Sequence, residues 1–304
     1  MLRRLVIQIL LLCFFSLIVN SQELDSSLVW DEKDLAWMGN NSPLPMEANQ
    51  RIQYFIRTFQ TRGKSTFTRS LAQGVRYIPL MKEIFQKMEV PEELVYLALI
   101  ESGFDPHASY KTTCGPWQFT PATAKKYGLK INPWIDERKN PEKSTWAATQ
   151  YLRDLYQEFG CWYLALAGFN AGEGSIKKAL KRYETRDFWG FKTDGYLKKN
   201  TLNIVPQSIA AALIAQDPER YGIALQSSGD SLSYEKVKVS QEIDLREIAR
   251  IAEVDLKELR ELNPELKKLS IPPDYPEYEL KVPTGKKEIV EKNLDTLYKA
   301  KRAQ

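Results

Sequence analysis

Histidine is almost absent from this sequence, which excludes two kinds of chemistry. His107 is the one histidine among 304 residues. It fits no ordinary pattern of a histidine-rich metal site or of a catalytic triad that depends on histidine. We expect His107 to lie in a solvated loop after Pro106.

The sequence also lacks an excess of charge of one sign. The chain carries 43 Lys and Arg against 39 Asp and Glu, and Arg3 and Arg4 are the charged residues of its first 22 positions. The remainder has 41 basic and 39 acidic side chains, so it is nearly neutral. Proteins that bind nucleic acid usually present a strongly basic surface, and we therefore predict no nucleic-acid partner.

Cysteine is scarce as well, with Cys13, Cys114 and Cys161 the only examples. If the chain is exported, Cys114 and Cys161 enter an oxidising compartment and a disulfide between them is one alternative. Two separate buried thiols are the other alternative, and the one we favour. The sequence does not show whether their Cα atoms fall within the ~4.4–6.8 Å that a disulfide needs.

The first 22 residues have the pattern of an export signal. Two arginines precede an apolar run of roughly a dozen residues, and small or polar residues follow where a signal peptidase could cut. Gln8 and Ser16 interrupt the run, which is short for a membrane span of about 20 residues. An uncleaved anchor is therefore the weaker alternative, and three leucines before Cys13 disfavour a lipoprotein.

Period-2 alternation, which is typical of strands, is nearly absent before residue 230, whereas helical spacing recurs from about residue 46 to 216. We predict an N-terminal helical region over residues 23–85 and an all-α domain over residues 86–226. The polar segment "SSGDSLS" then predicts a linker. Residues 234–285 have the pattern of a small βααβ module. Residues 286–304 have that of a charged tail, either a helix or a frayed end.

The stretch "VPEELVYLALIESGF" at residues 90–104 predicts a helix with a glutamate among apolar side chains. Leu94, Leu97, Ala98 and Glu101 follow the i, i+3, i+4, i+7 spacing, so Glu101 shares the core-facing stripe. Partial withdrawal from water raises the pKa of a carboxyl group, which suits a general acid near neutral pH. A solvated glutamate in a last helical turn is the plainer interpretation of this stretch alone.

Two further blocks complete a pattern that is typical of a polysaccharide cleft. "CGPWQFTPATA" presents a tryptophan and an amide before a capped helix, and "ALAGFNAGEGSI" places Asn170 at a glycine-bounded turn. Sugars offer flat apolar faces to aromatic rings and hydroxyl groups to side-chain amides. Each block alone is weak evidence, but their order and spacing together indicate such a cleft.

From about residue 49 to 214 these blocks resemble the lytic transglycosylase branch of the lysozyme superfamily, the SLT domain. The resemblance implies a lysozyme-like fold for residues 86–226, and it needs neither metal nor cofactor. It gives Glu101, in the "ES" motif, the role of sole catalytic carboxylate. It also implies substrate-binding roles for Ser102, Ser109, Gln118, Phe119, Asn170, Ala171 and Gly172.

The sequence departs from the family pattern at five positions. Phe169 stands where the family commonly has tyrosine, and Thr112 and Thr113 replace a small Gly-Ala pair. In the later block "NTLNIVP", Asn200 and Ile204 take the places of a glutamate and a tyrosine. That tyrosine supports the acid in relatives, so Ile204 bears on how the pKa of Glu101 is set.

Ordinary glycosidases use two carboxylates. The candidates for a second one are Asp105, Asp136 and Glu137, whose plainer interpretation is structural. The resemblance instead implies that one glutamate protonates the glycosidic oxygen and then accepts the proton of the same sugar's C6 hydroxyl, which attacks the anomeric carbon. Cleavage of the MurNAc-GlcNAc β-1,4 bond of peptidoglycan would then leave 1,6-anhydro-MurNAc ends.

Residues 234–285 resemble a LysM module, a peptidoglycan-binding unit, although the usual Gly-Asp is missing and "IPPDYPEY" is inserted. Sugar binding and a purely structural role are both open for this module. Two alternatives also remain for the whole chain, a lysozyme or chitinase that uses water and a wall-binding scaffold without activity. We expect a monomeric periplasmic protein that binds glycan strands, and its association with the inner face of the outer membrane stays open.

Overall fold

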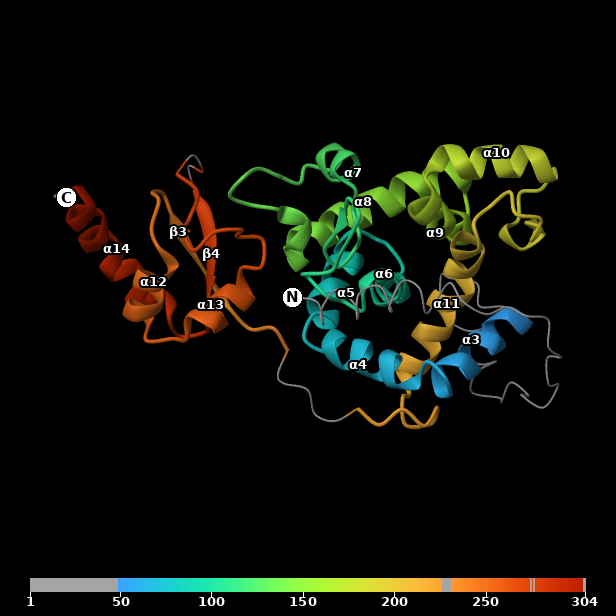
Figure 1. Cartoon of the computed structure of the whole chain (residues 1–304), viewed down its shortest axis with the longest axis horizontal. Helices are drawn as coiled ribbons and strands as arrows, with labels where there is room; N and C mark the ends of the chain where they lie inside the picture. Colours follow the sequence, from blue (N-terminus) through green and yellow to red (C-terminus); the bar gives the residue numbers. More distant parts are fainter. Residues whose placement is uncertain (1–48, 226–230, 274, 276, 303–304) are drawn as a thin grey trace.

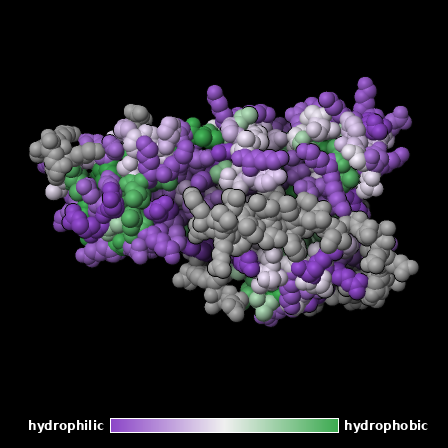
Figure 2. Space-filling view, viewed as in Figure 1, coloured by the Kyte–Doolittle hydropathy of each residue, from purple (hydrophilic) through white to green (hydrophobic). Residues whose placement is uncertain are grey.

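The computed structural model of the chain describes residues 49–225, 231–273, 275 and 277–302. The predicted export signal, the first part of the predicted helical region 23–85 (residues 23–48) and most of the predicted linker lie outside these residues. In the described part of the chain, no helix is both long and apolar enough to cross a membrane. A larger helical unit and a smaller unit with the C-terminus lie along the long axis (Figure 1). Hydrophilic residues make up most of the coloured surface in Figure 2.

The larger unit, residues 49–225, is helical, as the sequence predicts. Its core is one cluster that runs from Ile52 to Ile223, so the helices of the predicted region 23–85 share it with the predicted domain 86–226. Three 3-10 helices, η1 (Glu92–Tyr96), η2 (Glu137–Lys139) and η3 (Phe188–Gly190), lie between the α-helices. The α-helices are α3 (Gln50–Gln60), α4 (Lys64–Gly74), α5 (Ile78–Lys87), α6 (Leu97–Ser102), α7 (Pro121–Lys126), α8 (Pro141–Phe159), α9 (Trp162–Ala171), α10 (Glu173–Tyr183) and α11 (Lys199–Gln216).

Two details of this unit differ from the sequence predictions. The stretch 90–104 is not one helix, because the 3-10 helix η1 precedes the short α6. A hairpin of β1 (Ser109–Tyr110) and β2 (Thr113–Cys114) also interrupts the predicted all-α domain. Strands this short show no alternation in the sequence, and their two-residue turn uses Lys111 at φ 51°.

The last helix of the unit, α11, extends N-terminal of the apolar run "VPQSIAAALIAQ" that predicts it, and it contains Pro206. Proline has no N–H group, so the carbonyl of Leu202, four residues earlier, loses its helical donor. Arg51 Nη2 from α3 donates a hydrogen bond to this carbonyl. The helix therefore continues through Pro206 because α3, which packs against it, satisfies the freed acceptor.

The smaller unit has the predicted βααβ order. It comprises β3 (Glu235–Val239), α12 (Leu245–Ala252), α13 (Leu256–Leu262) and β4 (Tyr278–Val282), with β3 and β4 antiparallel. Of the two alternatives for the charged tail from residue 286, the structure has the helix, α14 (Lys287–Arg302), and it packs on β3 and α12. Val290 and Leu294, four residues apart on one face of α14, are buried in the core of the module.

The two units dock against each other in addition to being joined by the chain. Ile135, in the loop between α7 and α8, is 0% exposed and belongs to the core of the module. It forms an isolated β-bridge with Leu266, and the next backbone N–H, that of Asp136, donates to the carbonyl of Glu265 at 2.9 Å. The sequence pattern predicts a separate module, whereas a loop of the helical unit completes the core of this one.

Polar side chains reinforce the docking interface. Asn140 Nδ2 donates to Glu265 Oε1 at 2.7 Å, and the hydroxyl of Tyr278 donates to the same oxygen at 2.9 Å. Nearby, Lys236 Nζ of the module lies 2.8 Å from Glu142 Oε1 of the helical unit. Glu265 of the module and Glu142 of the helical unit thus each have a partner on the other unit, which favours a fixed arrangement of the two units.

Candidate active site

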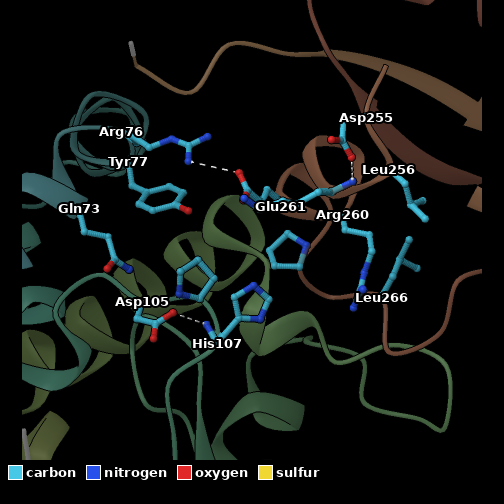
Figure 3. A pocket seen from close by; sticks show the side chains of 13 residues that line it. Gln73, Arg76, Tyr77, Asp105, His107, Asp255, Leu256, Arg260, Glu261 and Leu266 are labelled. Atoms are coloured by element: carbon cyan, nitrogen blue, oxygen red, sulfur yellow. Dashed lines mark hydrogen bonds and ion pairs between the residues drawn. The ribbon is translucent and has the colours of Figure 1, made fainter. Parts of the chain in front are cut away.

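Two cavities of the described structure are large enough to hold part of a saccharide. One of about 850 Å³ lies between the units and carries charges of both signs (Figure 3). There Arg76 and Glu261 form an ion pair at 3.7 Å, and Lys257 lies 3.9 Å from the same carboxylate. The other, about 540 Å³, lies in the helical unit and contains Glu101, the one carboxylate among the described residues that line it. We take this second cavity as the candidate active site.

Glu101 lies in the last turn of α6, and two features fix that turn. Gly103 ends the helix at φ 67°, and a Cβ at this position would meet Ser70 Oγ at 2.5 Å, so glycine is needed for both conformation and space. Ser102 is buried, and its hydroxyl donates to the carbonyl of Pro116 at 2.7 Å. Helix α6 is thereby tied to the loop that forms the adjoining wall of the cavity.

The side chain of Glu101 is partly buried, and Asn170 is its one side-chain hydrogen-bond partner among the described residues. Asn170 Nδ2, at the end of α9, donates to Glu101 Oε1 at 3.2 Å. Burial raises the pKa of Glu101 to about 7, against the opposing effect of the Asn170 hydrogen bond. A large fraction of this carboxyl group is therefore protonated near neutral pH, as a general acid requires.

Thr201 is a functional residue that the sequence analysis missed. It is buried near the start of α11, and its hydroxyl donates to Asn170 Oδ1 at 3.0 Å, which turns the amide nitrogen of Asn170 toward Glu101. The sequence feature that could have identified it is its place in the block "NTLNIVP", directly after Asn200. Ile204, in the place of the family's tyrosine, is buried in the core. Burial and Asn170 therefore set the pKa of Glu101 without a tyrosine.

Gln118 lines the cavity and also holds its own loop together. Its Oε1 accepts a hydrogen bond from Thr113 Oγ1 at 2.8 Å, and its Nε2 donates to the carbonyl of Gly115 at 2.8 Å. Thr113 is one of the departures from the family pattern, and the small residue usual there could not make this bond. Ser109 is exposed on β1 of the same hairpin and does not line the cavity.

Aromatic rings form the apolar part of the wall. The ring centroid of Phe169 lies 5.6 Å from that of Phe119 and 5.1 Å from that of Tyr151. Tyr110 and Tyr196, which the sequence analysis did not single out, also line the cavity and are 41% and 42% exposed. Exposed tyrosine rings suit stacking against the apolar faces of sugars.

The structure thus brings most of the predicted site residues together. Those that line the cavity are Glu101, Gln118, Phe119, Asn170 and Ala171. The others, Ser102, Ser109 and Gly172, do not line it. Ser102 uses its hydroxyl to bond the backbone, and Gly172, at φ 84°, separates α9 from α10. Ser102 and Gly172 therefore shape the elements around the cavity without lining it.

The alternative carboxylates have structural partners instead. Asp105 accepts a hydrogen bond from the backbone of His107 at 2.8 Å in a turn beside the larger cavity, and His107 is exposed, as predicted. Glu137 is buried and lies 2.6 Å from Lys143 Nζ. Asp136 pairs with an arginine. None of the three lines the cavity of Glu101 among the residues that the structure describes.

Arg138 links the docking loop to the wall of the cavity. Its Nε and Nη2 donate to the two carboxylate oxygens of Asp136 at 2.9 and 2.7 Å. Its Nη1 donates to the carbonyls of Thr112 and Phe119 at 2.7 and 3.0 Å. The chain passes so close that a Cβ on Gly115 would lie 1.8 Å from the carbonyl oxygen of Arg138. Because Asp136 is also bonded to the module, a line of contacts runs from the module to the cavity wall.

Cys114 and Cys161 are both free thiols, as in the favoured alternative, but only Cys114 is fully buried. Cys114 is buried in β2, and burial, together with the nearby charge of Asp136, raises the pKa of its thiol. Cys161 is half-buried at the start of α9. A raised thiol pKa makes Cys114 a poor nucleophile, so it contributes packing rather than chemistry.

Comparison with known families agrees with this geometry. Residues 80–192 match the model of the transglycosylase SLT domain, and this part of the chain belongs to that family. Residues 233–299 match the LysM-like domain of lytic transglycosylase MltD, a match that includes most of α14. Both resemblances drawn from the sequence are therefore confirmed.

Individual relatives are of the same kind. Membrane-bound lytic murein transglycosylase D from each of two Escherichia coli strains is 30% identical over 261 residues, which are 84% of this chain and 57% of the relative. Peptidoglycan transglycosylase gp16 of Escherichia phage T7 is 33% identical over 156 residues, which are 48% of this chain and 12% of gp16. The chain thus spans little more than half the length of the transglycosylase D relatives.

Proposed function

We propose that the protein is a lytic transglycosylase, a carbon-oxygen lyase that cleaves the MurNAc-GlcNAc β-1,4 bond of peptidoglycan and leaves 1,6-anhydro-MurNAc ends in wall remodelling or turnover. The observation that carries the proposal is Glu101, the one carboxylate among the described residues that line the cavity, where burial raises its pKa to about 7. The SLT family match and the transglycosylase relatives agree with this assignment.

In the proposed reaction Glu101 acts first as an acid and then as a base. Its proton passes to the glycosidic oxygen as the bond from that oxygen to the anomeric carbon of MurNAc breaks. The C6 hydroxyl oxygen of the same MurNAc then bonds to the anomeric carbon, and its proton returns to the Glu101 carboxylate. Nucleophile and electrophile belong to one sugar, so their effective concentration is high and no second carboxylate is needed to activate water.

The other cavity residues hold the glycan. We assign hydrogen bonding of the sugar to Gln118 and to Asn170, whose amide also stabilises the ionised form of Glu101. The exposed rings of Tyr110 and Tyr196 offer stacking surfaces at the rim. Phe119 and Ala171 supply the apolar wall between them.

We further propose that the protein is exported and works in the periplasm as a monomer. The arginine-led apolar pattern of residues 1–22 supports export. The Escherichia coli relatives are named as membrane-bound, and a peptidoglycan substrate requires an envelope location. Size-exclusion chromatography of the mature chain and fractionation of producing cells check both points.

Mass analysis of the soluble products from purified sacculi tests the proposed function. A transglycosylase releases 1,6-anhydro-muropeptides, which are lighter by one water than the products of hydrolysis. Products with reducing ends would instead assign the chain to the lysozyme-like hydrolases. A purified, folded chain that releases nothing soluble would support the scaffold alternative.

A further inference from the structure

The charge of the Glu101 cavity is unusual for a site that holds a neutral sugar. Apart from Glu101, the charged side chains among the described residues that line it are two lysines, Lys178 of α10 and Lys198 at the start of α11. Because the pKa of Glu101 is raised to about 7, the lining carries at most one negative charge near neutral pH, and it is only partly formed, against two positive ones. A neutral glycan gives no reason for this excess, because its hydroxyl and acetamido groups carry no charge.

Both lysines lack partners, unlike the lysine beside one of them. Neither Lys178 nor Lys198 makes an ion pair or a side-chain hydrogen bond with any residue of the described chain, and both are exposed. By contrast, Lys177 lies 2.7 Å from Glu158 and is also paired with Glu173. The acidic residues of α8 and α10 therefore neutralise the lysine outside the cavity and leave the one inside it free.

The two lysines also stand apart from the acid. Burial and the Asn170 hydrogen bond account for the raised pKa of Glu101, and neither Lys178 nor Lys198 contributes to it. A cation close to the carboxyl group would lower its pKa and weaken it as an acid near neutral pH. Their position allows the lysines to bind the substrate without lowering the pKa of Glu101.

We propose that Lys178 and Lys198 bind carboxylate groups carried by the N-acetylmuramic acid residues of the glycan and so select anionic peptidoglycan over neutral chitin-like chains. This inference rests on the proposed function, and it names the substrate group that the cavity recognises. The carboxylate has two sources, the stem peptide or, on strands without stems, the free lactyl group. Exposed lysines bind either as point charges, with an affinity that salt weakens.

The test compares two double variants of the full chain. Lys178→Gln with Lys198→Gln removes the cavity charges, and Lys181→Gln with Lys199→Gln removes exposed lysines of the same two helices that do not line the cavity. The ligands are glycan strands with stems, strands stripped of stems by an amidase, and neutral oligomers of N-acetylglucosamine. Binding is measured by calorimetry at low and high salt, and KM and kcat are measured on both kinds of strand.

We expect the cavity variant to raise the Kd and KM for stem-bearing strands roughly tenfold, to lose most of the salt dependence, and to keep kcat, since it removes binding common to ground and transition states. The control variant and the neutral oligomer should show no change. An effect that disappears when the stems are removed identifies the stem carboxylates, and one that persists identifies the lactyl carboxylate.

Equal affinities and salt dependence for the two double variants would overturn the inference. If the cavity variant lost as much affinity for the neutral oligomer as for the strands, the inference would also fail, because the lysines would then shape the cleft and not bind a charged group. A failure of the proposed function looks different, since wild-type protein would bind strands without releasing 1,6-anhydro products. The calorimetric comparison remains decisive for the lysines in that case.

Discussion

Glu101 in the cavity and Glu142 at the docking interface are both drawn away from water, yet their pKa values move in opposite directions. Burial raises the pKa of Glu101 to about 7, with only a neutral amide to oppose it. Burial acts on Glu142 in the same sense, but the hydrogen bond and charge of Lys236, with help from Lys281 and Tyr234, lower its pKa overall. The difference between an acid and a structural anion here is a cation within reach.

The same contrast extends to the regions around these two residues. At the docking interface, carboxylates have partners across the two units, as in the ion pair of Glu142 with Lys236 and the hydrogen bond from Asn140 to Glu265. In the cavity, the acid and the cations are kept apart and available. Pairing fixes the module in place, whereas separation leaves groups free to act on a substrate.

Replacing Glu101 with Gln should have the largest effect. The amide is nearly isosteric but cannot deliver a proton, so we expect sacculus cleavage to fall by about 10²- to 10⁴-fold. Glu142→Gln is the matched control, and it should keep most of the activity because Glu142 lies outside the cavity. Release of soluble muropeptides measures both variants. Near-normal cleavage by the Glu101 variant would move the chemistry elsewhere.

The stability of these variants should respond to pH with opposite signs. The pKa of Glu101 rises from 4.5 to about 7 on folding, so the folded state holds the proton more tightly and loses stability as pH rises from about 4.5 through 7. Relative to Glu101→Gln, wild type should therefore lose ~3 kcal/mol of unfolding free energy between about pH 4 and 8.

For Glu142 the folded pKa is lowered, so its contribution to stability is present above its unfolded pKa and disappears as pH falls through the folded value. Relative to Glu142→Gln, wild type should gain stability as pH rises from the acid side. Urea unfolding of the three proteins at several pH values checks both trends. If the contributions of Glu101 and Glu142 to the unfolding free energy changed with pH in the same direction, the contrast between the two residues would be wrong.

Asn140 offers a way to loosen the interface without touching the cavity. Its Oδ1 caps α8 by accepting from the backbone of Lys143, and its Nδ2 donates to buried Glu265. Asn140→Ala removes both bonds and should cost about 2 kcal/mol of unfolding free energy. Asn140→Asp keeps the cap but places a second carboxylate against that of Glu265. Its loss of unfolding free energy should therefore become smaller at low pH, where a carboxylate is protonated. Thermal or urea unfolding with no loss in either variant would show that the interface does not hold the module.

Thr201→Val should have the smallest effect. The variant keeps the shape of the side chain but frees the Asn170 amide from its anchor, so the hydrogen bond to Glu101 weakens. We expect roughly a fivefold loss of cleavage, in line with about 1 kcal/mol for one hydrogen bond, together with a higher pKa of the acid. Thr201→Ser should restore both. A loss of activity without a shift of the pH profile would indicate a structural role alone.

The sequence was sufficient for those parts of the site that follow from local pattern. Glu101 could be predicted because helical spacing places it with Leu94 and Leu97. Asn170 could be predicted because Gly172 follows it closely, although it lies in the last turn of α9 and not in the predicted turn after the helix. Thr201 and Tyr196 reach the cavity only through the packing of α11 and its preceding loop, which no local pattern encodes. Ser102 shows the reverse, since a motif position does not say that its side chain turns inward.

The docking of the module could not be predicted from the sequence either, because it also depends on tertiary packing that no local pattern encodes. Ile135 shares its loop with Leu129, Ile131 and Trp134, and the sequence does not mark it as a core residue of the module. Val290 and Leu294 lie four residues apart in the charged tail, which fits a helix but does not show what that helix packs against. Their burial depends on surfaces supplied by distant parts of the chain. Pattern therefore predicted the βααβ order, and tertiary contact decided that a fifth element and a loop of the helical unit complete it.

The pH dependence of kcat/KM on glycan strands tests most directly whether a single buried glutamate is the acid. This ratio reports the pKa of the essential acid in the free enzyme. We predict that kcat/KM falls about tenfold per pH unit above a midpoint near 7, the value to which burial raises the pKa of Glu101. A midpoint at the ordinary pKa of 4.5, or activity that keeps rising through the alkaline range, would contradict the account.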